Sequence, residues 1–400
     1  MHRTESTRRS SLPQTGWLLG LGVAVAIVTA HLIAPSSHAE IISDDTPVPP
    51  VGALGGPSRA LDPAEMEQFI RGRKVFDRDW RLGQGLGNDF NGDSCRSCHQ
   101  DPVIGGSGGL DVNVFRFAND NGGAGPFMDL PGGQIASKLR RPDLLGREDH
   151  DTAADLFEQR NSPSVLGLGL IETIEAATIF ANEDPNDTDG DGVRGVARMV
   201  DVAGTPEVGR LGWKAGVPQI EDFIGDAMGN EIGITSPDTG RGFAFLTDAD
   251  GVADPELSTS DFDDMLFFMQ LLAAPPRGGS SNPMVALGEQ VFSDIGCDTC
   301  HTPTLPGADG PVPLYSNLLL HDIHGPTFRG MAEAGADVGF YRTPPLWGVR
   351  FTAPYLHDGR AETLLDAVLM HADEAQASRD AYDALSPMEQ DALIEFLSDL

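Results

Sequence analysis

Apolar residues recur at helical spacing in several parts of the chain, and two of these parts resemble each other. The first helix is expected to follow Asp62, which is an N-cap with proline at the first helical position after it, and the helix carries Gly72 and Phe76. A similar run contains Gly288 and Phe292. The pattern therefore predicts an internal repeat in which each unit begins with a helix.

Each unit is also expected to end in an apolar helix. One such helix is expected from about Ser260, and the other from Ser386, which forms a capping box with Glu389. A proline- and glycine-rich stretch at residues 275–280 has the composition of a linker. The first unit carries a long irregular insertion, from about residue 101 to residue 255. We therefore expect two mainly helical domains, at residues 61–275 and 276–400.

The N-terminal segment has the pattern of a secretory signal. Arg8 and Arg9 precede an apolar run at residues 17–34, and a small-x-small cleavage site ends at Ala39. We expect residues 1–39 to be a signal peptide and residues 40–60 a linker, so that the mature protein is periplasmic and has no stable membrane insertion. Because the apolar run is nearly long enough to span a bilayer, an uncleaved membrane anchor is the less favoured alternative.

All four cysteines of the chain belong to two C-x-x-C-H motifs, and this motif is the attachment signature of a c-type haem. The residues concerned are Cys95, Cys98 and His99, and Cys297, Cys300 and His301. A disulfide between cysteines three apart does not require the histidine, and a four-cysteine zinc site leaves both histidines unexplained. The motifs therefore predict two covalently bound haem c groups, each with the adjacent histidine as an axial iron ligand. Such haem is attached outside the bacterial cytoplasm, which agrees with export.

The 400-residue chain is longer than one compact core usually allows, and it is strongly acidic, with a formal net charge of -33. This charge argues against nucleic acid and anionic membranes as partners. It favours a basic partner, such as a small cytochrome-type redox protein. Solubility, or adaptation to a salty setting, explains the charge equally well.

An acidic loop in the insertion resembles the first half of a calcium-binding loop. Asp187, Asp189 and Asp191 alternate with small residues and are followed by Gly192. The position of the bidentate glutamate of an EF-hand is occupied by Arg198, so the loop is not an EF-hand. A Ca2+ site and an ordinary acidic surface turn are both open at this point.

Two C-terminal stretches carry a family resemblance. Residues 342–350 (Arg-Thr-Pro-Pro-Leu-Trp-Gly-Val-Arg) and 353–360 (Ala-Pro-Tyr-Leu-His-Asp-Gly-Arg) resemble the signature of bacterial di-haem oxidoreductases, which are related to bacterial di-haem cytochrome c peroxidases. Residues 167–172 and 209–215 are similar to the oxidoreductase branch, which has been described both as peroxidases and as thiol oxidoreductases. The resemblance covers most of residues 62–400. It implies a mainly α fold of two cytochrome c-like domains with one haem each.

The resemblance also places a distal ligand of the C-terminal haem on the helix that follows residue 360. In the peroxidases this ligand is usually methionine, and the corresponding position here is His371 rather than Met370. Helical spacing agrees, because Leu364, Ala367, Val368 and His371 share one face and Met370 lies about 100° away. We therefore expect His371 to be the sixth ligand. Two histidine ligands would lower the reduction potential of that haem and suit a relay role.

No sequence motif identifies a sixth iron ligand for the N-terminal haem. An open iron is the catalytic alternative, and ligation by an unrecognised side chain is the other; the candidates are His150, Met128, Met199 and Met228. Glu172 is the candidate acid–base residue for peroxide chemistry, although a helix cap or an arginine partner explains it as well.

Several single residues have more than one interpretation. Trp213 and Trp347 are either electron conduits between the haems or ordinary core aromatics. His357 either contacts a haem propionate or holds a turn. His321 and His324 either tune the second haem, bind a surface metal, or do neither.

These observations predict an exported di-haem c-type oxidoreductase of the cytochrome c peroxidase type. Hydrogen peroxide would be reduced at the N-terminal haem, with electron transfer between the haems and a small redox protein or small-molecule oxidant as partner. One alternative is a non-catalytic electron-transfer cytochrome with two six-coordinate haems. Another is an oxidase acting on a thiol or protein substrate.

Overall fold

The computed structural model describes residues 46–130, 134–140 and 150–400. The predicted signal peptide and the beginning of the predicted linker lie outside these residues. The described residues all belong to one compact unit. None of the helices in this part of the chain combines the length and the apolarity needed to cross a bilayer.

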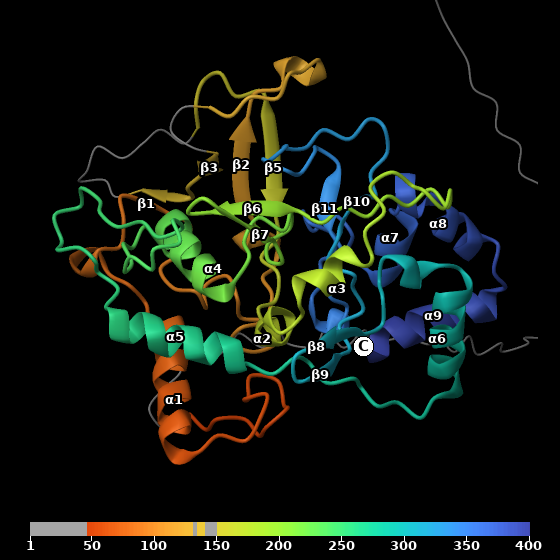
Figure 1. The fold of residues 1–400 in the computed structure, drawn as a ribbon, viewed down its shortest axis with the longest axis horizontal. Coiled ribbons are helices and arrows are strands. Elements are labelled where there is room, and N and C mark those ends of the chain that lie inside the picture. The colour runs from red at the N-terminus through yellow and green to blue at the C-terminus, as the bar shows by residue number, and fades with distance from the viewer. Residues whose placement is uncertain (1–45, 131–133, 141–149) are drawn as a thin grey trace, which may run out of the picture. The chain divides into compact units, whose positions relative to one another are not determined.

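The four helices expected from the sequence are present and pack in two pairs (Figure 1). Helix α1 (Pro63–Asp77) packs against α5 (Thr259–Leu271), and α6 (Pro283–Asp294) packs against α9 (Pro387–Asp399). The predicted N-cap at Asp62 and the predicted capping box at Ser386 are present, each with proline in the first turn; Asp62 also forms a capping box, with Glu65. Helix α5 begins slightly earlier than expected, because Ser258 rather than Ser260 is its N-cap.

Each pair crosses at a glycine. A Cβ atom at Gly72 would lie 1.9 Å from Asp264 O, and one at Gly288 would lie 1.9 Å from Ala392 O. Any larger residue would therefore force the two helix backbones apart. The repeated glycine seen in the sequence has a packing cause in both units.

One turn after each glycine, a phenylalanine fills the space between the two helices. The ring centroid of Phe76 lies 5.6 Å from that of Phe268, and the ring centroid of Phe292 lies 5.4 Å from that of Phe396. All four side chains are buried. The two units thus build the same apolar contact with different sequences.

The other α-helices of the described residues are short. They are α2 (Leu168–Glu172), α3 (Ala176–Phe180), α4 (Ile220–Ala227), α7 (Leu364–Leu369) and α8 (Gln376–Asp383). Strands β2 (Val114–Ala118), β3 (Ile135–Ala136) and β5 (Leu156–Arg160) form an antiparallel sheet in the order β3-β2-β5. The two-stranded sheets are β1 (Asp89–Phe90) with β4 (Leu139–Arg140), β6 (Met199–Val202) with β7 (Thr205–Val208), β8 (Leu305–Gly307) with β9 (Gly310–Val312), and β10 (Leu320–Asp322) with β11 (Phe340–Arg342).

The expectation of a mainly α fold is wrong. Helices account for 32% of the structure and strands for 14%. The difference arises in the insertion and in residues 302–363, where the strands and helices are short and much of the described chain is irregular. Glycine and proline are frequent in both segments, and they disfavour long helices.

Two separate hydrophobic clusters underlie the two helix pairs. The larger includes Phe69, Phe76 and Phe268, and it also takes in Leu305 and Leu319 from beyond the predicted linker. The smaller is built from residues 285–400. The division into domains at residue 275 stays a prediction.

Candidate haem sites

The C-terminal C-x-x-C-H motif opens into a cavity of about 580 Å³. Cys297, Cys300 and His301 all line it, because the motif forms a helical turn in which the amide of His301 donates to Cys297 O at 3.0 Å. Residues three and four apart lie on the same side of such a turn. His371 lines the same cavity.

Hydrogen bonds orient both of these histidines. His301 Nδ1 lies 3.1 Å from Tyr315 O, and His371 Nδ1 lies 2.7 Å from Ala367 O. With the proton on Nδ1, each ring donates to a carbonyl and keeps a lone pair on Nε2, as axial haem ligands require. The pKa of His301 is lowered to about 3, mainly by burial of the ring and secondly by the nearby His371. The neutral, ligating form is therefore favoured.

Helix α7 presents its predicted face to this cavity. Leu364, Ala367, Val368 and His371 line the cavity, whereas Met370 is 40% exposed and lies outside the lining. The structure therefore brings His371, and not Met370, into the cavity that contains the second haem motif. Iron ligation by His371 itself stays a prediction.

The N-terminal motif opens into its own cavity, of about 360 Å³. Cys95, Cys98 and His99 line it, and the amide of His99 donates to Cys95 O at 3.0 Å, as in the second motif. His99 Nδ1 lies 3.3 Å from Gly106 O, which leaves Nε2 as the lone-pair nitrogen. Burial lowers the pKa of His99.

A phenylalanine lies beside each motif histidine in nearly the same geometry. Phe76 and His99 have ring centroids 6.3 Å apart with an interplanar angle of 55°, and Phe292 and His301 have values of 6.4 Å and 56°. These are the phenylalanines that follow the crossing glycines. The helix pairs therefore position both motif histidines in the same way.

The two cavities share part of their walls. Trp213 and Asn161 line both of them, and Trp213 Nε1 donates to Asn161 O at 2.7 Å. Trp347 lines the C-terminal cavity and is absent from the lining of the other among the described residues. Of the two tryptophans singled out in the sequence, Trp213 is the one placed between the cavities.

Residues 150–400 match the sequence model of the family described as "Di-haem oxidoreductase, putative peroxidase". The chain belongs to this family of di-haem oxidoreductases. The match covers more than half of the chain and confirms the resemblance carried by the C-terminal stretches. No curated protein matches the sequence.

Solved structures that align with this di-haem oxidoreductase are distant. The diheme peroxidase BthA from Burkholderia thailandensis E264 has 17% identity and a TM-score of 0.43 over 88% of this chain and 90% of its own. A MauG-like protein associated with microbial copper homeostasis has 14% identity and a TM-score of 0.42 over 92% and 93%. Hydrazine synthase from Kuenenia stuttgartiensis has 17% identity and a TM-score of 0.39 over 91% and 100%. These values are too low to carry a functional argument.

The four candidate sixth ligands of the N-terminal haem are placed very differently in this oxidoreductase. Met228 is buried and lines the N-terminal cavity. Met128 and Met199 are about half exposed, and His150 packs against aromatic rings on the insertion sheet; none of these three lines the cavity. Met265 and Met269, which the sequence analysis did not single out, also line it. The sequence feature that could have identified them is their spacing of four residues, which places both on one face of α5.

The catalytic role expected for Glu172 is not supported by its position. Glu172 lines neither cavity. Its carboxylate accepts hydrogen bonds from the amide of Ile220, at 2.5 Å, and from Gln270 Nε2, at 3.2 Å. Because Ile220 is the first residue of α4, Glu172 satisfies an otherwise unpaired amide at a helix N-terminus. The helix-cap alternative is the one that the structure supports.

Two other carboxyl groups, both partly buried, line the N-terminal cavity: Asp226 and Glu231. Asp226 accepts a hydrogen bond from Asn230 Nδ2 at 3.0 Å, and burial raises its pKa to about 6. Glu231 accepts from Asn91 Nδ2 at 2.6 Å, and burial raises its pKa as well. Sequence reasoning missed both, because their burial depends on segments far apart in the chain.

The other histidines singled out in the sequence line the C-terminal cavity. Asn317 Nδ2 donates to His321 Nε2 at 3.0 Å, and His321 Nδ1 lies 2.9 Å from Glu374 Oε2. His324 Nδ1 accepts from Arg360 Nη2 at 3.0 Å. His357 lies near Trp213, with ring centroids 6.5 Å apart. All three are held in the buried wall of the cavity rather than at a surface metal site.

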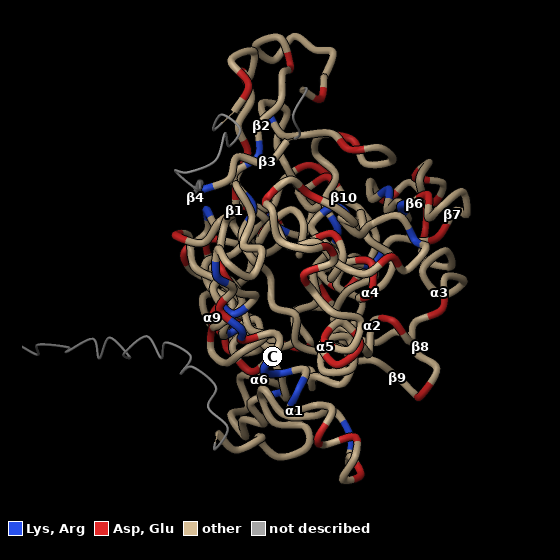
Figure 2. Tube along the Cα trace, turned by 90° about the vertical axis from the view of Figure 1, so that its left-hand side faces the viewer, with Lys and Arg blue, Asp and Glu red and all other residues tan. Residues whose placement is uncertain are grey.

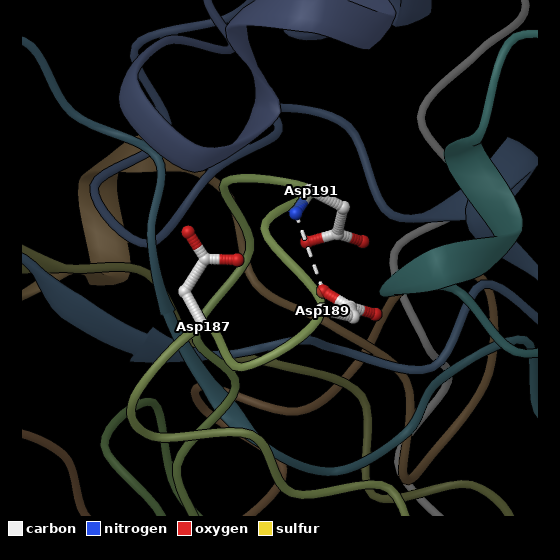
Figure 3. Close-up of side chains that lie close together, drawn as sticks. All are labelled: Asp187, Asp189 and Asp191. Atoms are coloured by element: carbon white, nitrogen blue, oxygen red, sulfur yellow. Dashed lines mark hydrogen bonds between the residues drawn. The ribbon is translucent and has the colours of Figure 1, made fainter.

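The acidic loop brings its three aspartates together (Figure 3). Asp187, Asp189 and Asp191 offer carboxylate oxygens that lie within 4.8 Å of one another, and the three side chains face one another across the loop. The amide of Asp191 donates to Asp189 Oδ1 at 3.2 Å, which tightens the turn. A second group of the same kind, Asp248, Asp250 and Glu256, was missed, although its Asp-x-Asp-Gly pattern resembles the first.

Proposed function

We propose that this di-haem oxidoreductase reduces hydrogen peroxide at its N-terminal haem, with the C-terminal haem as an electron relay. A haem with a free coordination position can bind and reduce peroxide, whereas one with two strong axial ligands passes electrons. The observation that carries the proposal is the difference between the two cavities. The C-terminal cavity contains His371 in addition to the motif histidine, and the described lining of the N-terminal cavity contains no histidine besides His99.

The residues of the chain have separate tasks in this proposal. Cys95, Cys98, Cys297 and Cys300 would bind the two haems covalently, since each pair lies with its histidine on the wall of one cavity. His99 and His301 would be the axial ligands, and His371 the second ligand of the relay haem. Trp213, held by Asn161 in the shared wall, would provide the aromatic path between the two sites.

Asp226 is the proposed proton donor and acceptor, in place of Glu172. Proton transfer is most efficient when the pKa of the group lies near the working pH. Burial raises the pKa of Asp226 to about 6, and its side chain lies on the wall of the N-terminal cavity. A carboxyl group in that position can hold a proton close to the substrate.

A second candidate function is electron transfer alone, and Met228 supports it. The thioether of a buried methionine on the cavity wall can serve as a sixth haem ligand. If Met228 ligated the iron firmly, both sites would be closed to peroxide. The two functions therefore differ in the ligation of one iron.

We also propose that the protein works in the periplasm with a small basic redox protein, and that Ca2+ binds the loop of Asp187, Asp189 and Asp191. The signal-like N-terminus supports export, and the formal net charge of -33 supports a basic partner. Figure 2 shows acidic residues along loops on many sides of the described chain. The mutual approach of the three carboxylates supports the cation.

Spectroscopy of the purified holoprotein tests the proposed function. We expect two haem c per chain, one of which binds CO or cyanide, and turnover of peroxide with a cytochrome donor. Two low-spin haems that bind neither ligand would instead support the electron-transfer alternative.

Substitutions test the assignment of His371. We expect His371→Ala to convert the C-terminal haem from low spin to high spin and to raise its reduction potential. Met370→Ala is the matched control and should leave both spectra unchanged, since Met370 is 40% exposed. A spectral change in the Met370 variant alone would refute the assignment.

A further inference from the structure

Three arginines surround one glutamate beside the N-terminal cavity. Arg116 Nη1 and Arg160 Nη1 donate to Glu333 Oε1 at 2.6 and 2.7 Å, and Arg198 Nη1 donates to Glu333 Oε2 at 2.7 Å. We call these four residues the arginine cluster. Its members come from β2, from β5, from the residue before β6, and from the segment between β10 and β11.

The sheet register explains how two of the arginines meet. Arg116 pairs with Glu158 across β2 and β5, and Arg160 lies two residues further along β5. Residues two apart in a strand share a face, so Arg116, Glu158 and Arg160 project together. Arg160 Nε also donates to Glu158 Oε1 at 2.6 Å.

The cluster is largely removed from solvent. The exposed fractions of the side chains are 16% for Arg116, 13% for Arg160, 9% for Arg198 and 16% for Glu333. Burial raises the pKa of Glu333, but the three arginines outweigh it and hold the pKa below its usual range. The cluster is therefore fully charged, with more cationic than anionic groups.

Each arginine keeps a buried N–H that no described residue accepts. These donors are Arg116 Nε, Arg160 Nη2 and Arg198 Nε. An unsatisfied buried donor is costly, and more so when it belongs to a charged group. All three arginines line the cavity that also contains Cys95, Cys98 and His99. We therefore expect the group that fills this cavity to accept hydrogen bonds from these arginine N–H donors.

We propose that the arginine cluster binds the propionates of the N-terminal haem. The inference rests on the proposed binding of haem in this cavity, and it does not require that peroxide is the substrate. A haem attached through Cys95 and Cys98 brings two carboxylates into the same enclosed space. Carboxylates are the acceptors that guanidinium groups bind most strongly, through charge-assisted hydrogen bonds.

Glu333 then has a positioning role for a haem that is attached more than 200 residues earlier in the chain. It holds three arginines in one place and offsets part of their charge. Removal of a negative charge near an iron favours the reduced, less positive state, and removal of a positive charge favours the oxidised state. Glu333 and the arginines should therefore shift the potential of this haem in opposite directions.

Spectroelectrochemical titration of the full-length holoprotein tests whether the arginine cluster binds the propionates of the N-terminal haem. We expect Glu333→Gln to raise the midpoint potential of the N-terminal haem and Arg198→Gln to lower it, with the C-terminal haem unchanged in both. Arg329→Gln is the matched control: Arg329 lies in the same segment as Glu333 but is 44% exposed and pairs with Asp120. Resonance Raman bands of the propionates should shift in the Arg198 variant and not in the control.

Several results would overturn the inference. Shifts of the two variants in the same direction would indicate general disturbance of the fold. If neither variant accumulates with haem, a pH titration of the propionate Raman bands in the wild-type protein provides the test. Propionate bands that titrate at ~4–5, as free carboxyl groups do, would exclude the arginine cluster as their partner. If added acetate shifts the N-terminal potential in wild-type protein but not in Arg198→Gln, the arginines bind a free anion instead. Lack of peroxide turnover would refute the proposed reaction and leave these readouts intact.

Discussion

Replacement of Gly288 by alanine tests the link between helix packing and the C-terminal haem. A Cβ atom at this position would lie 1.9 Å from Ala392 O and 2.7 Å from Phe396 Cβ. Cβ atoms essentially never approach another atom closer than 3.0 Å, so the helices would have to separate by at least 1.1 Å at Ala392. The obstructing atom is a backbone oxygen in the middle of α9, which cannot rotate away.

Two opposing contributions decide the size of the effect. Overpacking of a close-packed core costs ~1–3 kcal/mol, and alanine in a helix is more favourable than glycine by ~1 kcal/mol. Because the contact is between the backbones of α6 and α9, no side-chain rotation can relieve it, and we expect an overpacking cost near ~3 kcal/mol. Gly288→Ala should therefore lower the free energy of unfolding by ~2 kcal/mol.

Urea unfolding of the holoprotein measures this effect through far-ultraviolet circular dichroism. The absorbance of the C-terminal haem should change as well, because Phe292, one turn after Gly288, packs beside His301. Gly83→Ala is the control, since a Cβ there meets nothing within 4 Å. A Gly288→Ala protein as stable as wild type, or more stable, would show that helix propensity outweighs the contact and that the packing argument is wrong.

Three further outcomes are expected from other parts of the chain. Burial raises the pKa of Asp226 from 3.8 to about 6, so the folded protein keeps a proton that the unfolded chain has already released. The free energy of unfolding should therefore fall by up to ~3 kcal/mol as pH rises from about 4 to 6. Urea titrations at these two pH values should show that this pH-dependent loss of stability is absent from Asp226→Asn. Glu172→Gln should lower stability by ~1 kcal/mol by weakening the cap on α4, with both haem spectra unchanged; altered peroxide kinetics in that variant would restore its catalytic role. Metal analysis after dialysis should find calcium in wild-type protein and a reduced content in Asp189→Asn, and equal contents would exclude the loop as the site.

The local features of this protein could be predicted from its sequence. Some features depend on residues within a few positions of one another. They are the helix caps at Asp62 and Ser386, and the face of α7 that continues to His371 just after the helix. Helix geometry alone brings such residues together. The two C-x-x-C-H motifs are of the same kind, since one helical turn places the thiols and the histidine on one cavity wall.

The fold class could not be predicted from these local signals. The strong helical patterns lie at the ends of the two units, and they led to the expectation of a mainly α protein. In the insertion and in residues 302–363, the described elements are short helices and short strands, whose apolar runs are too brief to distinguish from loops. Their structure depends on contacts with other segments.

Only the tertiary structure decided what surrounds each haem motif. Glu172 is a plausible acid by residue type, yet its carboxylate caps the first residue of α4 and it lines neither cavity. Asp226 had no sequence signal at all, because its elevated pKa comes from burial by distant segments. Glu333 meets Arg116 across 217 positions of sequence. The sequence alone therefore determined the two C-x-x-C-H motifs at which haem attachment is predicted. The folded chain determined which charges and side chains line the cavity beside each motif, because cavities are formed by residues that are far apart in the chain.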